Sequence, residues 1–264
     1  MKQAKRKSSK AGSGILLLAM LVFAAGTVFF GWKTINYFMD SNKSRSYWAD
    51  VQRSAILLST AEQSVSTAEP GKEPEEPDGV PAAIDFDVLR ALSEDVVAWI
   101  TVPGTNINYL VAQSEDNDYY LRRLLDGSYA NGGTLFMDYR CAADLSDWNT
   151  VIYGHHMKDG SMFGALVDYS EQEFFEEHPV MYLYLPGKRY KLEPVAGCYV
   201  EADDEIYALP VSREEKDELL EKAVENSTFV STVTADTWDR LVTLSTCSDA
   251  AGSSRYVVLA RIAE

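Results

Sequence analysis

The chain has 264 residues, of which 46% are hydrophobic and 24% charged, and its formal net charge is −16 at pH 7. Because phosphate binding requires clustered lysine and arginine, this acidic balance argues against nucleic acid as a partner. Only three cysteines occur, Cys141, Cys198 and Cys247. A small secreted scaffold held by disulfides carries more cysteines in a shorter chain, so that class is excluded too.

The N-terminal residues predict a membrane anchor. A basic tail, residues 1–12, precedes a segment without charged side chains, residues 13–32. The apolar part of this segment is about as long as the ~17–25 residues that a helix needs to cross a bilayer. A cleaved signal peptide is the alternative, although its apolar region usually has only ~7–15 residues. Basic residues before the span predict a cytoplasmic N-terminus, and therefore a single-pass protein of the cell membrane whose remaining residues are extracellular.

The next segment changes character along its length. Mixed helical periodicity over 35–39 and 47–58 predicts one or two helices near the membrane surface. Residues 59–82 are rich in Ser, Thr, Glu, Pro and Gly, and such a stretch buries too little apolar surface to offset its ordering entropy. We therefore predict a juxtamembrane helix and a flexible acidic tether over 33–83, followed by a folded domain over 84–264.

The folded domain reads mainly as β-strands. After a short helix over 85–92, strands are predicted over 97–102, 108–111, 134–137, 150–153, 180–185, 190–200, 240–246 and 255–262. Helices are predicted over 162–169 and 212–226, and the second begins with Ser212-Arg-Glu-Glu, which has capping-box spacing. About eight short strands in a domain of this size are typical of a closed barrel or a sandwich.

Cys247 and two arginines lie on the last two predicted strands. A free cysteine is usually a small buried residue, but Cys247 ends a strand among polar neighbours, where a reactive thiol could meet a substrate. Arg255 begins the following strand and is suited to stabilise an oxyanion near that thiol. Arg261, near the far end of the strand, is expected to be a solvated surface charge.

A pair of histidines supplies a candidate proton carrier. His155 and His156 follow the strand over 150–154, and strand alternation places them on opposite faces, so at most one faces Cys247. The pattern does not decide between them. The only other histidine is His178, and no ligand spacing accompanies it, so no metal site is predicted.

These residues together resemble the sortase family, and specifically class B sortases. The family signature Thr-Leu-x-Thr-Cys, followed by an arginine after a short loop, reads Thr-Leu-Ser-Thr-Cys247 and Arg255 here. The family histidine follows a Tyr-Gly pair, which matches His155. Class B members often continue with a Met-x-x-x-x-Met-Phe pattern, found here over 157–163, and carry a helix before the cysteine strand, as over 212–226.

The resemblance implies a mostly β fold, an eight-stranded sortase-type closed β-barrel with added short helices. It implies transpeptidation of a C-terminal sorting signal of secreted proteins. Cys247 would attack the carbonyl after the signal's threonine to give a thioester, His155 would protonate the leaving amine, and Arg255 would hold substrate and oxyanion. An amine from a peptidoglycan cross-bridge or a pilin lysine would then resolve the thioester. No cofactor is implied.

The same resemblance suggests further residues along the substrate groove by their position in the chain. They are Asn117, Leu121, Tyr153, Ser245 and Tyr207. Some sortases of another class use calcium, but class B members generally lack it, and the acidic run over 201–205 is expected to be a solvated loop.

Two other functions stay open at this point. A membrane-bound cysteine peptidase would share the first half-reaction and release the acyl group to water. A non-enzymatic surface module would instead use Cys247 as a core residue and would lose no activity on its replacement by alanine.

Overall fold

The computed structural model describes residues 10–63, 80–236, 238–247 and 254–263. The chain divides into two compact units, Met1–Lys43 and Ser44–Glu264. Most of the predicted basic tail and most of the predicted acidic tether lie outside the described residues. So does the polar loop after Cys247.

The first helix, α1 (Lys10–Gln63), begins in the first unit and continues into the second without a break at the predicted end of the membrane span. The stretch Gly14–Ile56 contains a window of mean hydropathy 2.3, so by length and composition it is able to cross a membrane. The large apolar side chains of its first half are exposed. A single helix of this kind near an N-terminus fits either an anchor or a signal sequence.

The part of α1 in the second unit belongs to that unit's core. Trp48, Val51 and Ala55 are buried, and the Trp48 ring meets the ring of Tyr109 edge-on, with 5.9 Å between centroids. The three helical positions are three and four residues apart, so they form one stripe on one side of the helix. The compact unit therefore begins before the expected domain start at residue 84.

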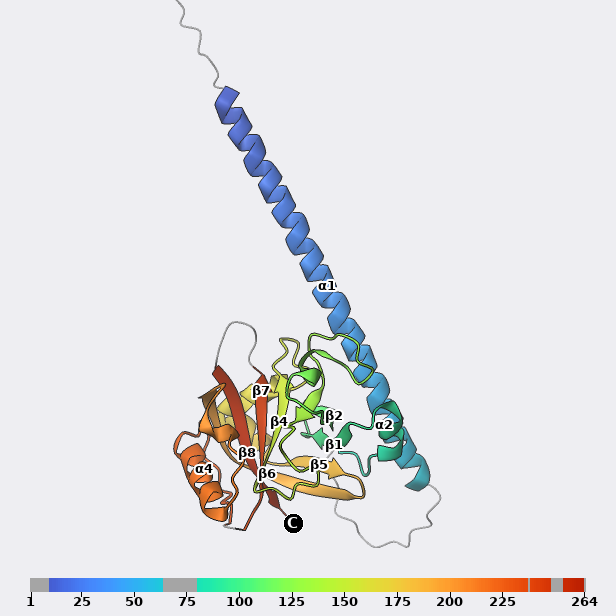
Figure 1. The fold of residues 1–264 in the computed structure, drawn as a ribbon, viewed down its shortest axis with the longest axis vertical. Helices are drawn as coiled ribbons and strands as arrows, with labels where there is room; N and C mark the ends of the chain where they lie inside the picture. The colour runs from blue at the N-terminus through green and yellow to red at the C-terminus, as the bar shows by residue number, and fades with distance from the viewer. Residues whose placement is uncertain (1–9, 64–79, 237, 248–253, 264) are drawn as a thin grey trace, which may run out of the picture. The chain divides into compact units, whose positions relative to one another are not determined.

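The predicted eight-stranded closed β-barrel is confirmed (Figure 1). Its strands are hydrogen-bonded in the order β1-β2-β3-β4-β7-β8-β6-β5. The strand bounds are β1 Val96–Thr101, β2 Asn108–Ala112, β3 Leu135–Met137, β4 Asn149–His155, β5 Met181–Leu185, β6 Lys188–Glu201, β7 Leu241–Cys247 and β8 Ser254–Ala263. Most pairs are antiparallel, but β2 and β3 are parallel, and so are β4 and β7. Residues at the carboxyl ends of β4 and β7 therefore meet at one end of the barrel.

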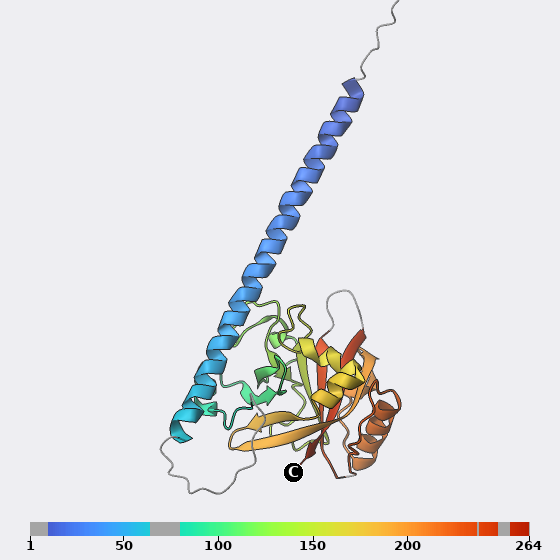
Figure 2. The ribbon, with the colours of Figure 1, turned by 180° about the vertical axis from the view of Figure 1, so that it is seen from behind.

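Short helices connect the strands. They are α2 Phe86–Leu92, η1 Tyr119–Arg122, η2 Gly164–Ser170, α3 Gln172–Glu177, η3 Glu205–Tyr207 and α4 Arg213–Glu225, the η elements being 3₁₀ helices. The view from behind shows η2 and α3 in yellow, and η2 contacts β7 and β8 (Figure 2). The helix predicted over 162–169 is present as the 3₁₀ helix η2, which begins two residues later, because Met162 has φ of 57°, outside the helical region.

The α4 helix begins as its sequence predicts, with a side-chain cap at Ser212. The Ser212 side chain accepts a hydrogen bond from the Glu215 N–H, while the Glu215 carboxylate accepts one from the Val211 N–H. Leu219 and Ala223 are buried in a second cluster, with residues of β6, β7 and β8. This cluster lies outside the main core, so α4 covers an outer face of the barrel wall (Figure 1).

Candidate active site

The register between two parallel strands brings the proposed histidine and cysteine positions together. In the β4–β7 pair, Tyr153 is paired with Ser245, Gly154 with Thr246, and His155 with Cys247. These positions are 92 residues apart in the chain, and they become neighbours only because both strands end at the same edge. The predicted nucleophile and the predicted proton carrier are therefore direct partners across these two strands.

Arg255 completes this arrangement from the strand on the other side of β7. It is half-buried, and its Nη1 donates to the carbonyl of Thr246 at 3.4 Å. The Thr246 hydroxyl accepts a hydrogen bond from the Tyr256 N–H at 3.0 Å and donates to the Tyr256 carbonyl at 3.2 Å. The hydroxyl thus joins β7 to β8, and the guanidinium lies beside the peptide bond that leads into Cys247.

The structure distinguishes the two adjacent histidines that the sequence pattern left undecided. His155 is half-buried, and its Nε2 lies 2.7 Å from the carbonyl oxygen of Leu121. A carbonyl oxygen only accepts, so Nε2 carries the hydrogen of this bond. His156 is exposed and forms an isolated bridge with Met162. The third histidine, His178, stacks on the Phe174 ring with 4.2 Å between centroids, which is a packing role.

Two glycines allow the close packing that places His155. A Cβ on Gly154 would lie 2.6 Å from the Phe163 ring and 2.3 Å from a leucine methyl group, so no side chain fits there. Gly133 has φ of +57°, and a Cβ on it would lie 2.5 Å from the Leu121 carbonyl oxygen. Glycine at 133 therefore leaves room for the carbonyl that binds the imidazole.

Three of the predicted groove residues form one row beside this site. The Tyr207 hydroxyl and the Ser245 Oγ are hydrogen-bonded at 2.8 Å. The rings of Tyr153 and Tyr207 are tilted neighbours, with 5.9 Å between centroids. Since Tyr153 and Ser245 are strand partners, this row lies two residues before the His155–Cys247 pair on both strands.

The other two predicted groove residues, Asn117 and Leu121, lie on the connection between β2 and β3. Leu121 enters the site through its carbonyl, as described above. Asn117 donates from Nδ2 to a carboxylate oxygen of Asp138 at 3.0 Å. Sequence reasoning did not identify Asp138 or Arg140, which bind each other through two side-chain hydrogen bonds. The only sequence signal for them was an acid and an arginine two residues apart directly after a strand.

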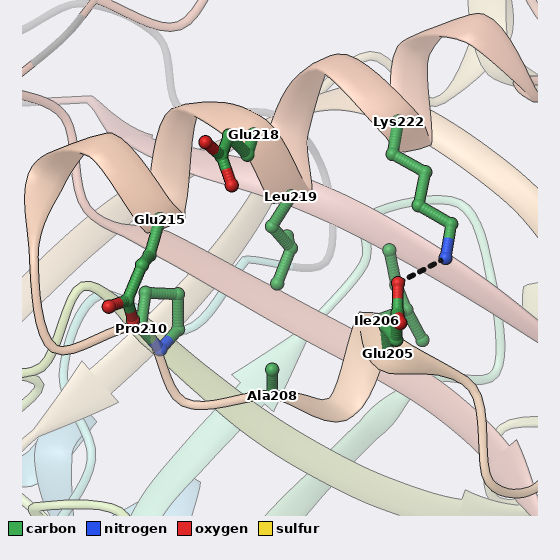
Figure 3. A pocket seen from close by; sticks show the side chains of 8 residues that line it. All are labelled: Glu205, Ile206, Ala208, Pro210, Glu215, Glu218, Leu219 and Lys222. Carbon is green, nitrogen blue, oxygen red and sulfur yellow. Dashed lines mark hydrogen bonds and ion pairs between the residues drawn. The ribbon is translucent and has the colours of Figure 1, made fainter.

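A separate pocket lies on the outer side of η3 and is bounded by α4 (Figure 3). Its volume is about 360 Å³, and its walls include Ile206, Ala208 and Leu219. Part of the predicted acidic loop borders it: Lys222 forms ion pairs with Asp204 at 3.6 Å and with Glu205 at 3.0 Å. The predicted solvated loop is thus partly ion-paired. Within the residues that the structure describes, no group of three or more His, Cys, Asp or Glu side chains is arranged to hold a metal.

Arg261 is not the solvated charge that the sequence predicted. Its Nη2 lies 2.6 Å from a Glu193 carboxylate oxygen and its Nη1 lies 3.3 Å from one of Asp239. Glu193 on β6 is the direct strand partner of Arg261, so the two side chains share one face of the sheet. These ion pairs stabilise the far end of β8.

Cysteine, histidine and arginine positions at one end of three neighbouring barrel strands define the class of site, that of a β-barrel cysteine transpeptidase. Residues 100–263 match the family model described as Sortase domain. The chain belongs to the sortase family, and its similarities place it in class B.

Two curated relatives and a solved structure illustrate this similarity to class B enzymes. Sortase B of Listeria monocytogenes is 38% identical over 161 residues, which are 60% of this chain and 65% of the relative. Sortase B of Staphylococcus aureus is 28% identical over 94% of this chain and 96% of the relative. The solved Staphylococcus aureus sortase B–substrate complex superposes with a TM-score of 0.73 at 28% identity, covering 86% of this chain and 99% of that one.

Proposed function

We propose that this chain is a membrane-anchored sortase that cleaves the C-terminal sorting signal of secreted proteins after its threonine and transfers the acyl group to an amine. The observation that carries the proposal is the pairing of His155 with Cys247 across β4 and β7. The contact between Arg255 and the Thr246 carbonyl supports it from the third strand.

In the first half-reaction, the Cys247 thiolate forms a bond to the carbonyl carbon of the signal's threonine. The carbonyl π electrons move to oxygen, and Arg255 stabilises the resulting negative charge. When the tetrahedral intermediate collapses, the carbon–nitrogen bond breaks and His155 gives a proton to the leaving amine. A free thiol with a pKa of ~8.5 is largely protonated at neutral pH, so nearby positive charge is needed to favour the thiolate.

The Leu121 carbonyl sets the role of each imidazole nitrogen. Because Nε2 is engaged with this oxygen, Nδ1 is the nitrogen that exchanges protons with the reacting groups. A backbone acceptor of this kind takes the place of the Asp or Asn side chain that orients histidine in other triads.

In the second half-reaction, an amine attacks the thioester, His155 takes the amine's proton, and the thiolate leaves. We propose an amine of the peptidoglycan cross-bridge or a pilin lysine as the acceptor. The similar Staphylococcus aureus enzyme was solved as a complex with a substrate, which supports a substrate-binding site in the same barrel here.

The anchor proposal rests on the helix stretch Gly14–Ile56 and on the five basic residues before it. We propose that the helix spans the cell membrane once with a cytoplasmic N-terminus and an extracellular barrel. If so, the full-length chain stays in the membrane fraction after alkaline carbonate washing, and added protease degrades the barrel in intact cells. Release of a shortened, soluble barrel into the medium would instead indicate a cleaved signal peptide.

The experiment that separates transfer from hydrolysis uses the full-length chain in detergent. It is incubated with peptides of the Leu-Pro-x-Thr-Gly and Asn-Pro-x-Thr-x types, with and without triglycine. A transpeptidase gives a joined product whose share rises with amine concentration. If the acyl group goes only to water at every amine concentration, the chain acts as a cysteine peptidase.

A further inference from the structure

Asp138 lies directly after β3, and its side chain is fully buried. Its Oδ1 accepts hydrogen bonds from the Arg140 N–H at 3.0 Å and from Nε at 2.9 Å. Its Oδ2 accepts from Arg140 Nη2 at 2.8 Å, Asn117 Nδ2 at 3.0 Å and the Tyr153 hydroxyl at 3.0 Å. Burial opposes ionisation, but the hydrogen bonds from Arg140 outweigh it and hold the pKa of Asp138 below its usual value. One buried anion thus organises donors from three segments.

One of these segments carries the acceptor for the imidazole. Asn117 is held at both ends of its amide, because its Oδ1 also accepts from the Tyr139 N–H at 3.1 Å. Four residues later, the Leu121 carbonyl binds His155. Asp138 therefore fixes one end of the connection that orients the histidine.

The other donors lead to the opposite side of the site. Arg140 Nη2 donates to the Tyr207 carbonyl at 3.4 Å, and the Tyr207 hydroxyl bonds Ser245. Tyr153, bound to Asp138, lies against the Tyr207 ring. The carboxylate therefore reaches the tyrosine row that lies two residues before the His155–Cys247 pair.

We propose that Asp138, acting through Arg140, Asn117 and Tyr153, is a positioning residue that holds both sides of the acyl-donor site in register with Cys247. The proposal rests on the proposed transpeptidase function and adds a residue that touches neither substrate nor reacting atoms. It assigns to the Asp138–Arg140 pair the placement of the groups that bind the sorting peptide.

The test compares Asp138→Asn with Asp147→Asn in the full-length chain. Asp147 is a matched control: it lies in the same connection between β3 and β4, where its carboxylate accepts from the Ala142 N–H at 2.6 Å. The amide of Asp138→Asn keeps the shape but loses the charge and one acceptor oxygen. Hydrogen bonds to charged groups are worth enough to predict a rise of about 10- to 100-fold in KM for the peptide. The rate of Cys247 alkylation by iodoacetamide should change much less, and Asp147→Asn should leave both unchanged.

A change in melting temperature with KM within about twofold of the wild-type value would overturn the proposal and make Asp138 a stability residue only. If Asp138→Asn does not fold, Arg140→Gln decides, since Arg140 is half exposed and its replacement removes the link to Tyr207 while Asn117 and Tyr153 keep their acceptor. Arg140→Gln should also raise KM, and an unchanged KM would refute the link.

A readout without turnover separates this proposal from the proposed function. In protein labelled with fluorotyrosine, the ¹⁹F resonance of Tyr207 is identified as the one that is missing from the spectrum of Tyr207→Phe. It should shift or broaden in Asp138→Asn and stay in place in Asp147→Asn. If wild-type protein forms no acyl-enzyme with any peptide, the transpeptidase proposal fails. The ¹⁹F shift alone then decides whether Asp138 positions Tyr207.

Discussion

Replacing Thr246 by valine should remove the hydroxyl that joins β7 to β8 beside Cys247. The hydroxyl is buried, with Thr246 2% exposed, and it bonds both the N–H and the carbonyl of Tyr256. Valine has nearly the same shape, so the change leaves two backbone groups of Tyr256 unpaired without opening a cavity. An unsatisfied buried group costs about 1–3 kcal/mol, so we expect a total loss of roughly 2–6 kcal/mol for the two groups.

A loss of this size is readily measured. For a domain of roughly 200 residues, each kcal/mol shifts Tm by about 2–4 °C, so Thr246→Val should melt roughly 4–24 °C lower. Thr150→Val is the matched control, because Thr150 is fully buried on β4 and its hydroxyl has no hydrogen-bond partner among the described residues. Its Tm should stay the same or rise. If the two variants melt within about 2 °C of each other by differential scanning fluorimetry, the hydroxyl does not hold the strands together and the reasoning fails.

Three further predictions concern the two arginines of β8, the thiols and pH. Arg255→Gln should slow acyl-enzyme formation at least ~100-fold with little change in Tm, as expected for the loss of an oxyanion donor. Arg261→Gln should instead lower Tm and leave the rate of acyl-enzyme formation unchanged. The opposite pattern would contradict both roles. Burial raises the pKa of the two other thiols to about 11, so iodoacetamide should label one cysteine in native wild-type protein and none in Cys247→Ala, counted by intact mass. Hydrogen bonding from Lys191, together with Arg261, holds the pKa of Glu193 below its usual value. Its stabilisation is therefore present above the unfolded pKa of ~4.3 and lost as pH falls through the folded pKa, so Glu193→Gln should be less stable than wild type at pH 7 and equal to it at low pH.

The strands could be predicted because they are short, apolar and separated by turns, but this pattern fits a sandwich as well as a closed barrel. The barrel followed from the family resemblance, which rests on the contiguous motif that ends at Cys247. Strand alternation could not choose between His155 and His156, because it gives opposite faces but not the neighbouring strand. Only the Tyr-Gly pair of the family motif pointed to His155. That choice depends on the parallel register of β4 with β7, which pairs His155 with Cys247.

Side-chain partners distant in sequence were the hardest to predict. Asp138 binds Asn117 and Tyr153, which are 21 and 15 residues away, and these groups meet only when the barrel closes. Arg261 likewise finds its acid 68 residues away on β6. Apart from the arginine two residues after Asp138, no local pattern marks either residue, because an exposed charge and a paired one look the same in a single sequence.

The α1 helix shows a related limit. Trp48 and Val51 have the spacing of a buried stripe, but a helix near a predicted membrane span offers no sequence clue to the surface that it covers. In the structure that surface is the second unit's own core, next to Tyr109.

The measurement that tests the central proposal most directly is intact-mass spectrometry of the full-length chain after incubation with the two types of sorting peptide. The account predicts a covalent adduct equal to the peptide cleaved after threonine, located on Cys247 by fragmentation. The adduct should be absent from Cys247→Ala, greatly reduced in His155→Ala, and converted to joined product by triglycine. If Cys247 stays unmodified with every peptide and alkylates no faster than the two buried thiols, the account of the site is wrong.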